Sequence, residues 1–208
     1  MINTILTYDN QDDNLGDFFE RCATTTKESS NPDFNIHEIN SQALNELNIL
    51  LRANQVNDMP FLFVSFTHGS ENELLKGGKT PFISNTVNAS CLKNSFAYCF
   101  ACHAGKKLGH SIIENGATAF VGFKDELKIQ KFFDAIDSFV DCSTSGIISF
   151  ISGHNLIQAI EQMKEKYTDY IDQLYLKDMI IASWFMEHRD ALVLLGKTDI
   201  TISDFYIQ

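Results

Sequence analysis

The 208-residue sequence contains no apolar run of about 18 residues, which is the length that a membrane-spanning helix needs. Its first residues, MINTILTYD, lack the basic region and the long apolar region of a secretion signal. It also contains no internal repeat and no low-complexity segment. We therefore expect a cytoplasmic protein that forms one domain over residues 1–208 and has no membrane partner.

Positive charge is scarce. Lys and Arg together number 16 against 27 Asp and Glu, so the net charge is −11. Phosphate backbones and anionic lipids attract clustered cations, and this composition opposes both kinds of partner. We expect no nucleic-acid partner.

The cysteines are too few and too scattered for a disulfide scaffold. They number five, an odd count, at positions 22, 91, 99, 102 and 142. Cys99 and Cys102 form a C-x-x-C with His103 and His110 close by, which is one pattern of a zinc or redox site. Cys99, however, lies inside an apolar run and is expected to be a core residue. We expect reduced thiols, no metal and no cofactor.

Short apolar runs alternate with amphipathic stretches along the chain. This alternation predicts an α/β three-layer sandwich, in which helices flank a mostly parallel central sheet in flavodoxin-like order. A polar, glycine-containing stretch follows His68 and Gly69 up to Gly78, and residues 24–33 are expected to form a linker. Expected strands are residues 3–8, 34–39, 61–66, 96–101, 117–122, 191–195 and 200–205; expected helices are a segment starting at 15, then 41–51 (capped by Ser41), 108–115, 156–166 and 169–187.

Two chemically active side chains each follow a strongly apolar strand. His68 comes after residues 61–66 and Cys102 after residues 96–101. The carboxyl ends of parallel strands meet at one edge of a sheet, where ligands bind in open α/β folds. A thiolate attacks carbonyl carbon, and an imidazole can take the thiol proton and later protonate the leaving amine. We therefore predict a catalytic pair of His68 and Cys102.

Gly69 follows the histidine directly. A residue without a side chain lets a substrate backbone approach closely. We expect the amide N–H groups of Gly69 and Cys102 to form the oxyanion hole, which is commonly the largest contribution to acyl transfer.

Residues 63–69 (FVSFTHG) and 100–105 (FACHAG) resemble the two catalytic strand ends of caspase-like cysteine peptidases, most closely the bacterial CHAT and gingipain-like group. Residues 112–122 (IIENGATAFVG) and 189–196 (RDALVLLG) are similar to later segments of that group. The resemblance implies a caspase-like fold and cleavage of a protein substrate. It also implies activation by a protein partner or signal, as in CHAT-type proteins, which often occur in bacterial defence operons.

The sequence departs from the caspases at two positions. Phe100 replaces a glutamine and His103 replaces an arginine, so a preference for cleavage after aspartate is not expected. In relatives that cut after Arg or Lys, an acidic residue in the loop after the first strand lines the specificity pocket. The resemblance therefore assigns substrate binding to Asp9, Asp12 and Asp13 and implies cleavage after Lys or Arg.

Two other functions stay open. A catalytically silent caspase-like module would serve protein assembly, because a fold alone does not determine activity. A flavodoxin-like ligand-binding domain would need a phosphate-binding glycine loop after its first strand, and DNQDD stands there instead. Retention of His68, Gly69 and Cys102 together favours the peptidase.

Overall fold

The centre of the molecule is a six-stranded sheet with the order β2-β1-β3-β7-β8-β9. This computed structural model describes residues 1–129 and 135–206. The strands are β1 (Ile2–Tyr8), β2 (Phe34–Ile39), β3 (Phe61–Phe66), β7 (Ser95–Phe100), β8 (Ala119–Phe123) and β9 (Leu192–Gly196). All neighbours pair in parallel except β8 and β9. The predicted three-layer α/β sandwich with a mostly parallel sheet is confirmed.

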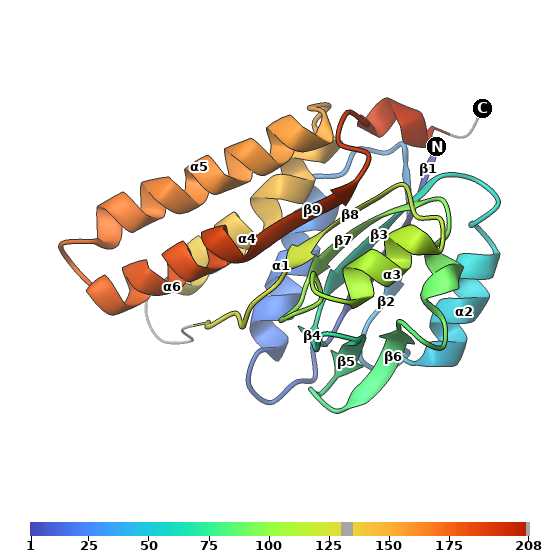
Figure 1. Ribbon diagram of the computed structural model, residues 1–208, viewed down its shortest axis with the longest axis horizontal. Coiled ribbons are helices and arrows are strands. Elements are labelled where there is room, and N and C mark those ends of the chain that lie inside the picture. The colour runs from blue at the N-terminus through green and yellow to red at the C-terminus, as the bar shows by residue number, and fades with distance from the viewer. Residues whose placement is uncertain (130–134, 207–208) are drawn as a thin grey trace.

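Helices cover both faces of this sheet (Figure 1). One layer contains α1 (Gly16–Glu28), α4 (Ala135–Ile151), α5 (Leu156–Leu174) and α6 (Met179–Ala191); the other contains α2 (Glu46–Asn54), α3 (Leu108–Glu114) and the 3-10 turn η1 (Ala89–Leu92). Within residues 1–129 and 135–206, no helix combines the length and the apolar character that a bilayer crossing requires.

Strand β3 is buried on both faces, which explains its continuous apolar sequence. Leu62, Val64 and Phe66 belong to the core beneath α1 and α4–α6. Phe61 and Phe63 belong to the core beneath α2 and α3. Full burial of one such side chain stabilises the fold by about 1.5–3 kcal/mol, so this strand anchors both layers.

A second, small sheet, which was not predicted from the sequence, begins at His68. It consists of β4 (His68–Gly69), β5 (Glu73–Lys76) and β6 (Thr80–Ser84) in antiparallel pairing. Residues 77–79 connect β5 to β6, and the Lys79 N–H donates to the Lys76 carbonyl at 3.1 Å. Gly77 and Gly78 have φ angles of 58° and 65°, the left-handed values that a type I′ turn needs at both central positions. The glycine pair therefore forms the turn of a hairpin.

The expected linker at residues 24–33 is wrong, because α1 continues to Glu28. Thr26 donates its hydroxyl to the carbonyl of Cys22, one helical turn earlier. Phe19, Cys22, Ala23 and Thr26 are all buried on one helix face. Burial of this face outweighs the low intrinsic helix propensity of a threonine-rich segment.

Other boundaries also differ from the expectation. Ser41 does not cap a helix: Asn45 caps α2 by accepting the N–H of Asn48. The last expected strand, residues 200–205, contains the 3-10 turn η2 (Ile202–Phe205). Helix α4 was not expected, and the two expected C-terminal helices instead break at residues 175–178, between α5 and α6.

His188 of α6 lies fully buried in the larger core. Its ring faces those of Phe100, Phe123, Phe139 and Tyr167 at centroid distances of 5.5–6.4 Å. In the part of the chain that the structure describes, no group lies in hydrogen-bonding geometry with either ring nitrogen. Burial lowers the pKa of His188 to about 3 and outweighs the opposite effect of the nearby Lys128 backbone. The imidazole is therefore neutral in the folded protein.

His188 should make the protein sensitive to acid. Between pH 6.5 and pH 3 the unfolded chain binds a proton that the folded chain does not, so the free energy of unfolding falls as pH falls. Between pH 7 and pH 5 this loss is about 2 kcal/mol. His188→Leu should remove it, measured by urea denaturation at both pH values. The exposed His110→Leu should retain it, and an equal loss in both variants would contradict the assignment.

Candidate active site

The pairing of β3 with β7 determines where His68 and Cys102 lie. Phe66 and Phe100 are partners in the parallel register. His68 follows Phe66 by two positions, and Cys102 follows Phe100 by two positions. The Thr67 N–H continues the ladder by donating to the Phe100 carbonyl at 3.3 Å. Neighbouring strands lie about 4.8 Å apart, so the two segments leave the sheet side by side.

Gly69 brings these segments into contact. A Cβ placed on Gly69 would lie 2.8 Å from the Ala101 Cβ and 2.8 Å from the Cys102 carbonyl oxygen. Real Cβ atoms do not approach so closely, and only glycine permits this packing. The backbone of the hairpin that contains His68 therefore rests directly on the backbone of Cys102.

The imidazole of His68 is held by Asp12. Its Nε2 lies 3.0 Å from the Asp12 Oδ2, and Phe19 packs against the ring edge-on at a centroid distance of 5.3 Å. Because a carboxylate only accepts, Nε2 is the donor in this bond. This bond uses Nε2 and leaves Nδ1 as the ring nitrogen that can accept a proton.

Asp12 remains ionised in this arrangement. Burial alone would raise its pKa, but the N–H groups of Leu15 and Asn14 and the imidazole of His68 together lower the pKa below its usual value. The two amides donate to Oδ1 at 2.7 and 2.9 Å. Asp12 therefore orients His68 from the turn that leads into α1.

The sulfur of Cys102 is partly covered. Its Sγ accepts the backbone N–H of Leu127 at 3.3 Å. Burial raises the pKa of this thiol, the Leu127 N–H lowers it, and the carboxylate of Glu126 raises it. The balance lies above the usual value, so the thiol form of Cys102 is favoured over the thiolate.

A sharp turn follows the cysteine. His103 has φ = 59°, a left-handed conformation that costs a non-glycine residue on the order of 1–3 kcal/mol. The loop after β8 supports it: the Asp125 carbonyl accepts the His103 N–H at 3.2 Å, and the Phe123 carbonyl accepts the Gly105 N–H at 2.8 Å. This strained turn ends β7 directly before the loop and positions Cys102 at the sheet edge.

The three aspartates after β1 have different environments. Asp9 is only 1% exposed, and its oxygens accept the Ser41 hydroxyl at 2.6 Å and the Gly77 N–H at 2.5 Å. Asp12 contacts His68, whereas Asp13 is exposed. Asp12 and Asp13 line a cavity of about 370 Å³, together with Asp17 and Ile136. Asp9 has no exposed oxygen for a substrate; it ties β1 to the hairpin turn.

The C-x-x-C pair is not a redox pair. Cys99 is buried in the core on the α2 and α3 side of the sheet, and Cys102 packs against the opposite core. Burial raises the pKa of Cys99 far above its usual value. Among the described residues, no group of three or more metal-binding side chains is gathered.

Sequence reasoning did not identify three contributors to this site. Asp12 was assigned to the substrate rather than to His68, and neither the Leu127 N–H nor the left-handed turn at His103 was expected. No local pattern signals them, because each contact joins segments far apart in the sequence. Asp12 and His68 are separated by 56 positions, Cys102 and Leu127 by 25.

Comparison with known proteins identifies the fold. No family model and no curated sequence matches the chain. The crystal structure of the Arg-specific cysteine proteinase gingipain R (RgpB) matches with a TM-score of 0.60 and 13% identity, over 96% of this chain and 47% of that one. A complex of Porphyromonas gingivalis RgpB pro- and mature domains matches with a TM-score of 0.59 and 13% identity, over 96% and 48%. The chain thus has a caspase-like fold and spans about half the length of these structures.

Cys102 should be the first thiol to react with iodoacetamide. All five cysteines lie within the described residues, and Cys102 alone is partly exposed. Because its pKa is raised, the alkylation rate should keep rising with pH up to and beyond pH 9. Peptide mapping by mass spectrometry between pH 6 and pH 10 measures this. Faster labelling of Cys91, whose pKa burial raises to about 12, would contradict the exposure argument.

Proposed function

We propose that this protein is a cysteine endopeptidase with His68 and Cys102 as its catalytic pair. The observation that carries the proposal is the register of β3 and β7, from which both residues leave at equal offsets. The contact of Gly69 with Ala101 and Cys102 supports it. The caspase-like fold, shared with a structure described as a cysteine proteinase, supports the reaction class.

The chemistry needs one proton acceptor and one oxyanion site. The Cys102 thiol transfers its proton to Nδ1 of His68 as the sulfur bonds to the scissile carbonyl carbon. The carbonyl oxygen becomes an oxyanion, which the N–H groups of Gly69 and Cys102 stabilise. The C–N bond then breaks and His68 protonates the leaving amine. Water, deprotonated by His68, hydrolyses the thioester and regenerates the thiol.

Asp12 assists as a positioning residue in this proposal. Its carboxylate holds Nε2 of His68, which fixes the tautomer with a free Nδ1. When His68 accepts the thiol proton, the adjacent negative charge stabilises the imidazolium. A histidine oriented by a carboxylate is a recurring arrangement in nucleophilic catalysis.

The protonated, partly covered thiol supports activation by a partner or signal. Cys102 is held by the Leu127 N–H and lies near the Glu126 carboxylate, which disfavours the thiolate. Movement of the loop after β8 would expose the sulfur and remove that carboxylate. We propose a cytoplasmic enzyme, in keeping with five unpaired cysteines. A bacterial defence role rests on the CHAT resemblance alone.

Cleavage after Lys or Arg is the proposed specificity. The cavity beside His68 is lined by the carboxylates of Asp12, Asp13 and Asp17. A second cavity, of about 420 Å³, is lined by four acidic residues and one lysine: Asp125, Glu126, Glu187, Asp190 and Lys128. Acidic surroundings attract a cationic side chain and disfavour an acidic one. The alternative of a catalytically silent assembly module predicts no turnover of any peptide.

Hydrolysis of a peptide library tests the proposed activity. Wild-type protein should release fluorophore, and Cys102→Ala should abolish release. His68→Ala should lower kcat at least about 100-fold, and Asp12→Asn about 10–100-fold with an acid shift of the pH profile. Wild-type levels of hydrolysis in Cys102→Ala would overturn the assignment. Absence of turnover in the wild type, even after loop cleavage or with cell extract, would favour the silent module.

Substrates ending in Arg, Lys, Asp and Leu test the proposed specificity. Arg and Lys should be preferred, and Asp13→Ala should lower kcat/KM for them by about fivefold, the effect expected of an exposed charge pair. Asp9→Asn is the matched control: it should lower stability without changing the preference, since Asp9 is buried. A preference for Asp or Leu would contradict the acidic pocket.

A further inference from the structure

The hairpin that contains His68 makes a second contact with the cysteine loop, at Glu71. The backbone carbonyl of Glu71 accepts the N–H groups of Lys107 and Leu108 at 3.2 and 2.8 Å. Its carboxylate contacts the Lys106 Nζ through Oε1 at 3.1 Å and the Lys107 Nζ through Oε2 at 2.9 Å. One residue of the β4–β5 turn thus makes four polar contacts with the segment that joins Cys102 to α3.

Gly69 and Glu71 contact opposite ends of the loop that contains Cys102 and His103. Gly69 contacts Ala101 and Cys102 at the start of the cysteine loop, and Glu71 contacts residues 106–108 at its end. The loop between, including the strained turn at His103, is therefore attached to the hairpin at both ends. Glu71 is only three residues from His68, so a shift of the turn is transmitted directly to the imidazole.

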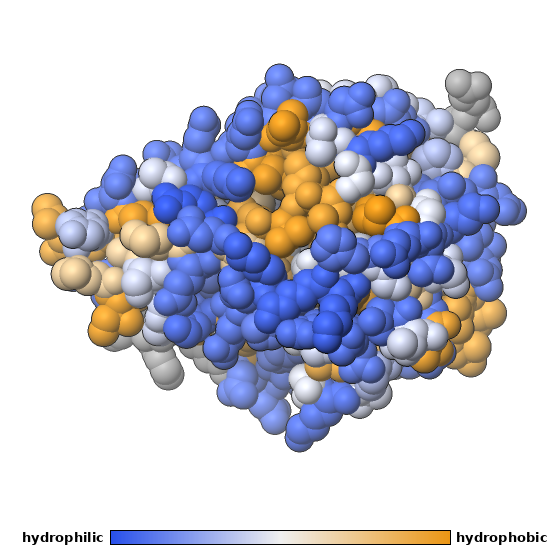
Figure 2. Space-filling model, viewed as in Figure 1, coloured by the Kyte–Doolittle hydropathy of each residue, from blue (hydrophilic) through white to orange (hydrophobic). Residues whose placement is uncertain are grey.

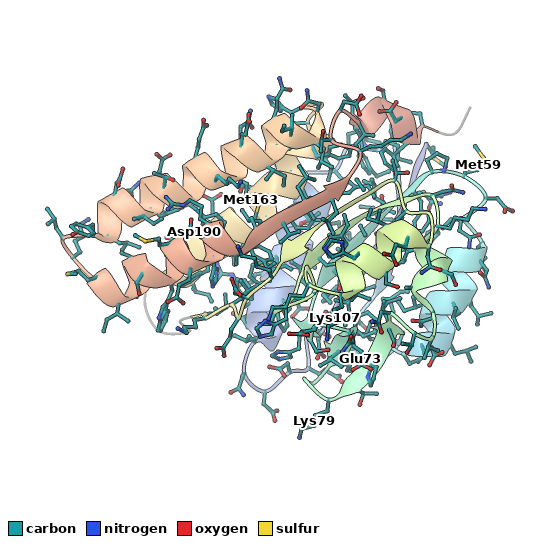
Figure 3. All side chains as sticks on the ribbon, in the orientation of Figure 1. Met59, Glu73, Lys79, Lys107, Met163 and Asp190 are labelled. Atoms are coloured by element: carbon teal, nitrogen blue, oxygen red, sulfur yellow. The ribbon has the colours of Figure 1, made fainter. Side chains whose placement is uncertain are left out.

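The turn around Glu71 is itself well fixed. The Ser70 N–H donates to the Glu73 carbonyl at 2.9 Å, and the Asn72 carbonyl accepts the Asn85 N–H at 2.9 Å. Figure 3 labels Lys107, which precedes α3, and Glu73, which begins β5 of the small sheet. Because the turn around Glu71 is fixed, its contacts hold residues 106–108 at a set distance from the hairpin.

The carboxylate is ionised throughout the working pH range. Hydrogen bonds from Lys107 and Lys106 lower the pKa of Glu71 to about 2. The side chains of Glu71, Lys106 and Lys107 are 38%, 39% and 62% exposed, so salt screens these pairs. Hydrophilic residues cover most of this part of the surface in Figure 2. Such pairs add little to global stability.

We propose that Glu71 is a positioning residue that sets the geometry between His68 and Cys102 by clamping the β4–β5 turn to residues 106–108. The proposal rests on the peptidase reaction above for its effect on turnover, but not for its effect on the thiol. Misplacement of a reacting group by about 1 Å can cost up to about 100-fold in rate. Loss of the clamp should therefore change catalysis far more than folding.

The test compares Glu71→Gln with wild type in peptide hydrolysis and in Cys102 alkylation. Glu71→Gln keeps both backbone bonds and removes the charge. It should lower kcat about tenfold with KM within about twofold, while the melting temperature changes by less than about 3 °C. Raising the salt concentration should lower wild-type kcat towards that of the variant. Glu38→Gln on β2, which weakens an exposed pair with Lys27 of α1, is the control and should keep wild-type kcat.

Two further variants separate positioning from general damage. Glu71→Lys should be slower than Glu71→Gln, and adding Lys106→Glu and Lys107→Glu should restore activity by reversing the pairs. Alkylation of Cys102 at pH 7 should slow severalfold in Glu71→Gln, and should be equal with and without Glu71→Gln in a His68→Ala background. Wild-type kcat and alkylation rates in Glu71→Gln would overturn the proposal. If no peptide is hydrolysed by the wild type, the alkylation comparison alone decides it.

Discussion

The parallel pairing of β3 with β7 is the constraint on which the rest of the site depends. Successive side chains of a strand point to opposite faces, so a slip of one residue would exchange the two cores and turn His68 and Cys102 away from each other. Burial of β3 on both faces prevents such a slip, because Phe63 and Val64 each fit only one core. The packing of the two hydrophobic cores thus sets the positions of His68 and Cys102 at the sheet edge.

Much of the fold could be predicted because β2, β3 and β7 are each indicated by a short, largely apolar run in the sequence. Strands 34–39 and 61–66 were predicted with the bounds that the structure has. The positions of His68 and Cys102 at neighbouring strand ends followed from the same runs together with the edge rule for parallel sheets. Prediction failed where a long-range contact decides the outcome. The threonine-rich end of α1 is helical because a core lies beneath it, and the segment before Gly78 forms strands only because β4, β5 and β6 pair.

The acidic loop shows why roles are harder to predict than positions. Asp9, Asp12 and Asp13 look equivalent in sequence, yet one is buried as a structural tie, one orients an imidazole and one is exposed. The difference arises from where the chain turns after Tyr8: the Asp12 carboxylate accepts two amides of the turn into α1 and still reaches His68. A count of carboxylates in a loop contains no information about such sharing.

The amide of Leu127 on the sulfur of Cys102 also bears on the chemical lifetime of the thiol. Peroxide oxidises thiolates, first to sulfenic acid and then irreversibly, whereas protonated thiols react slowly. Since burial and the Glu126 carboxylate raise the pKa of Cys102, its sulfur is shielded from oxidative loss in this arrangement. A partly exposed thiol of this kind stays reduced under oxidising conditions that would consume a thiolate at the same position.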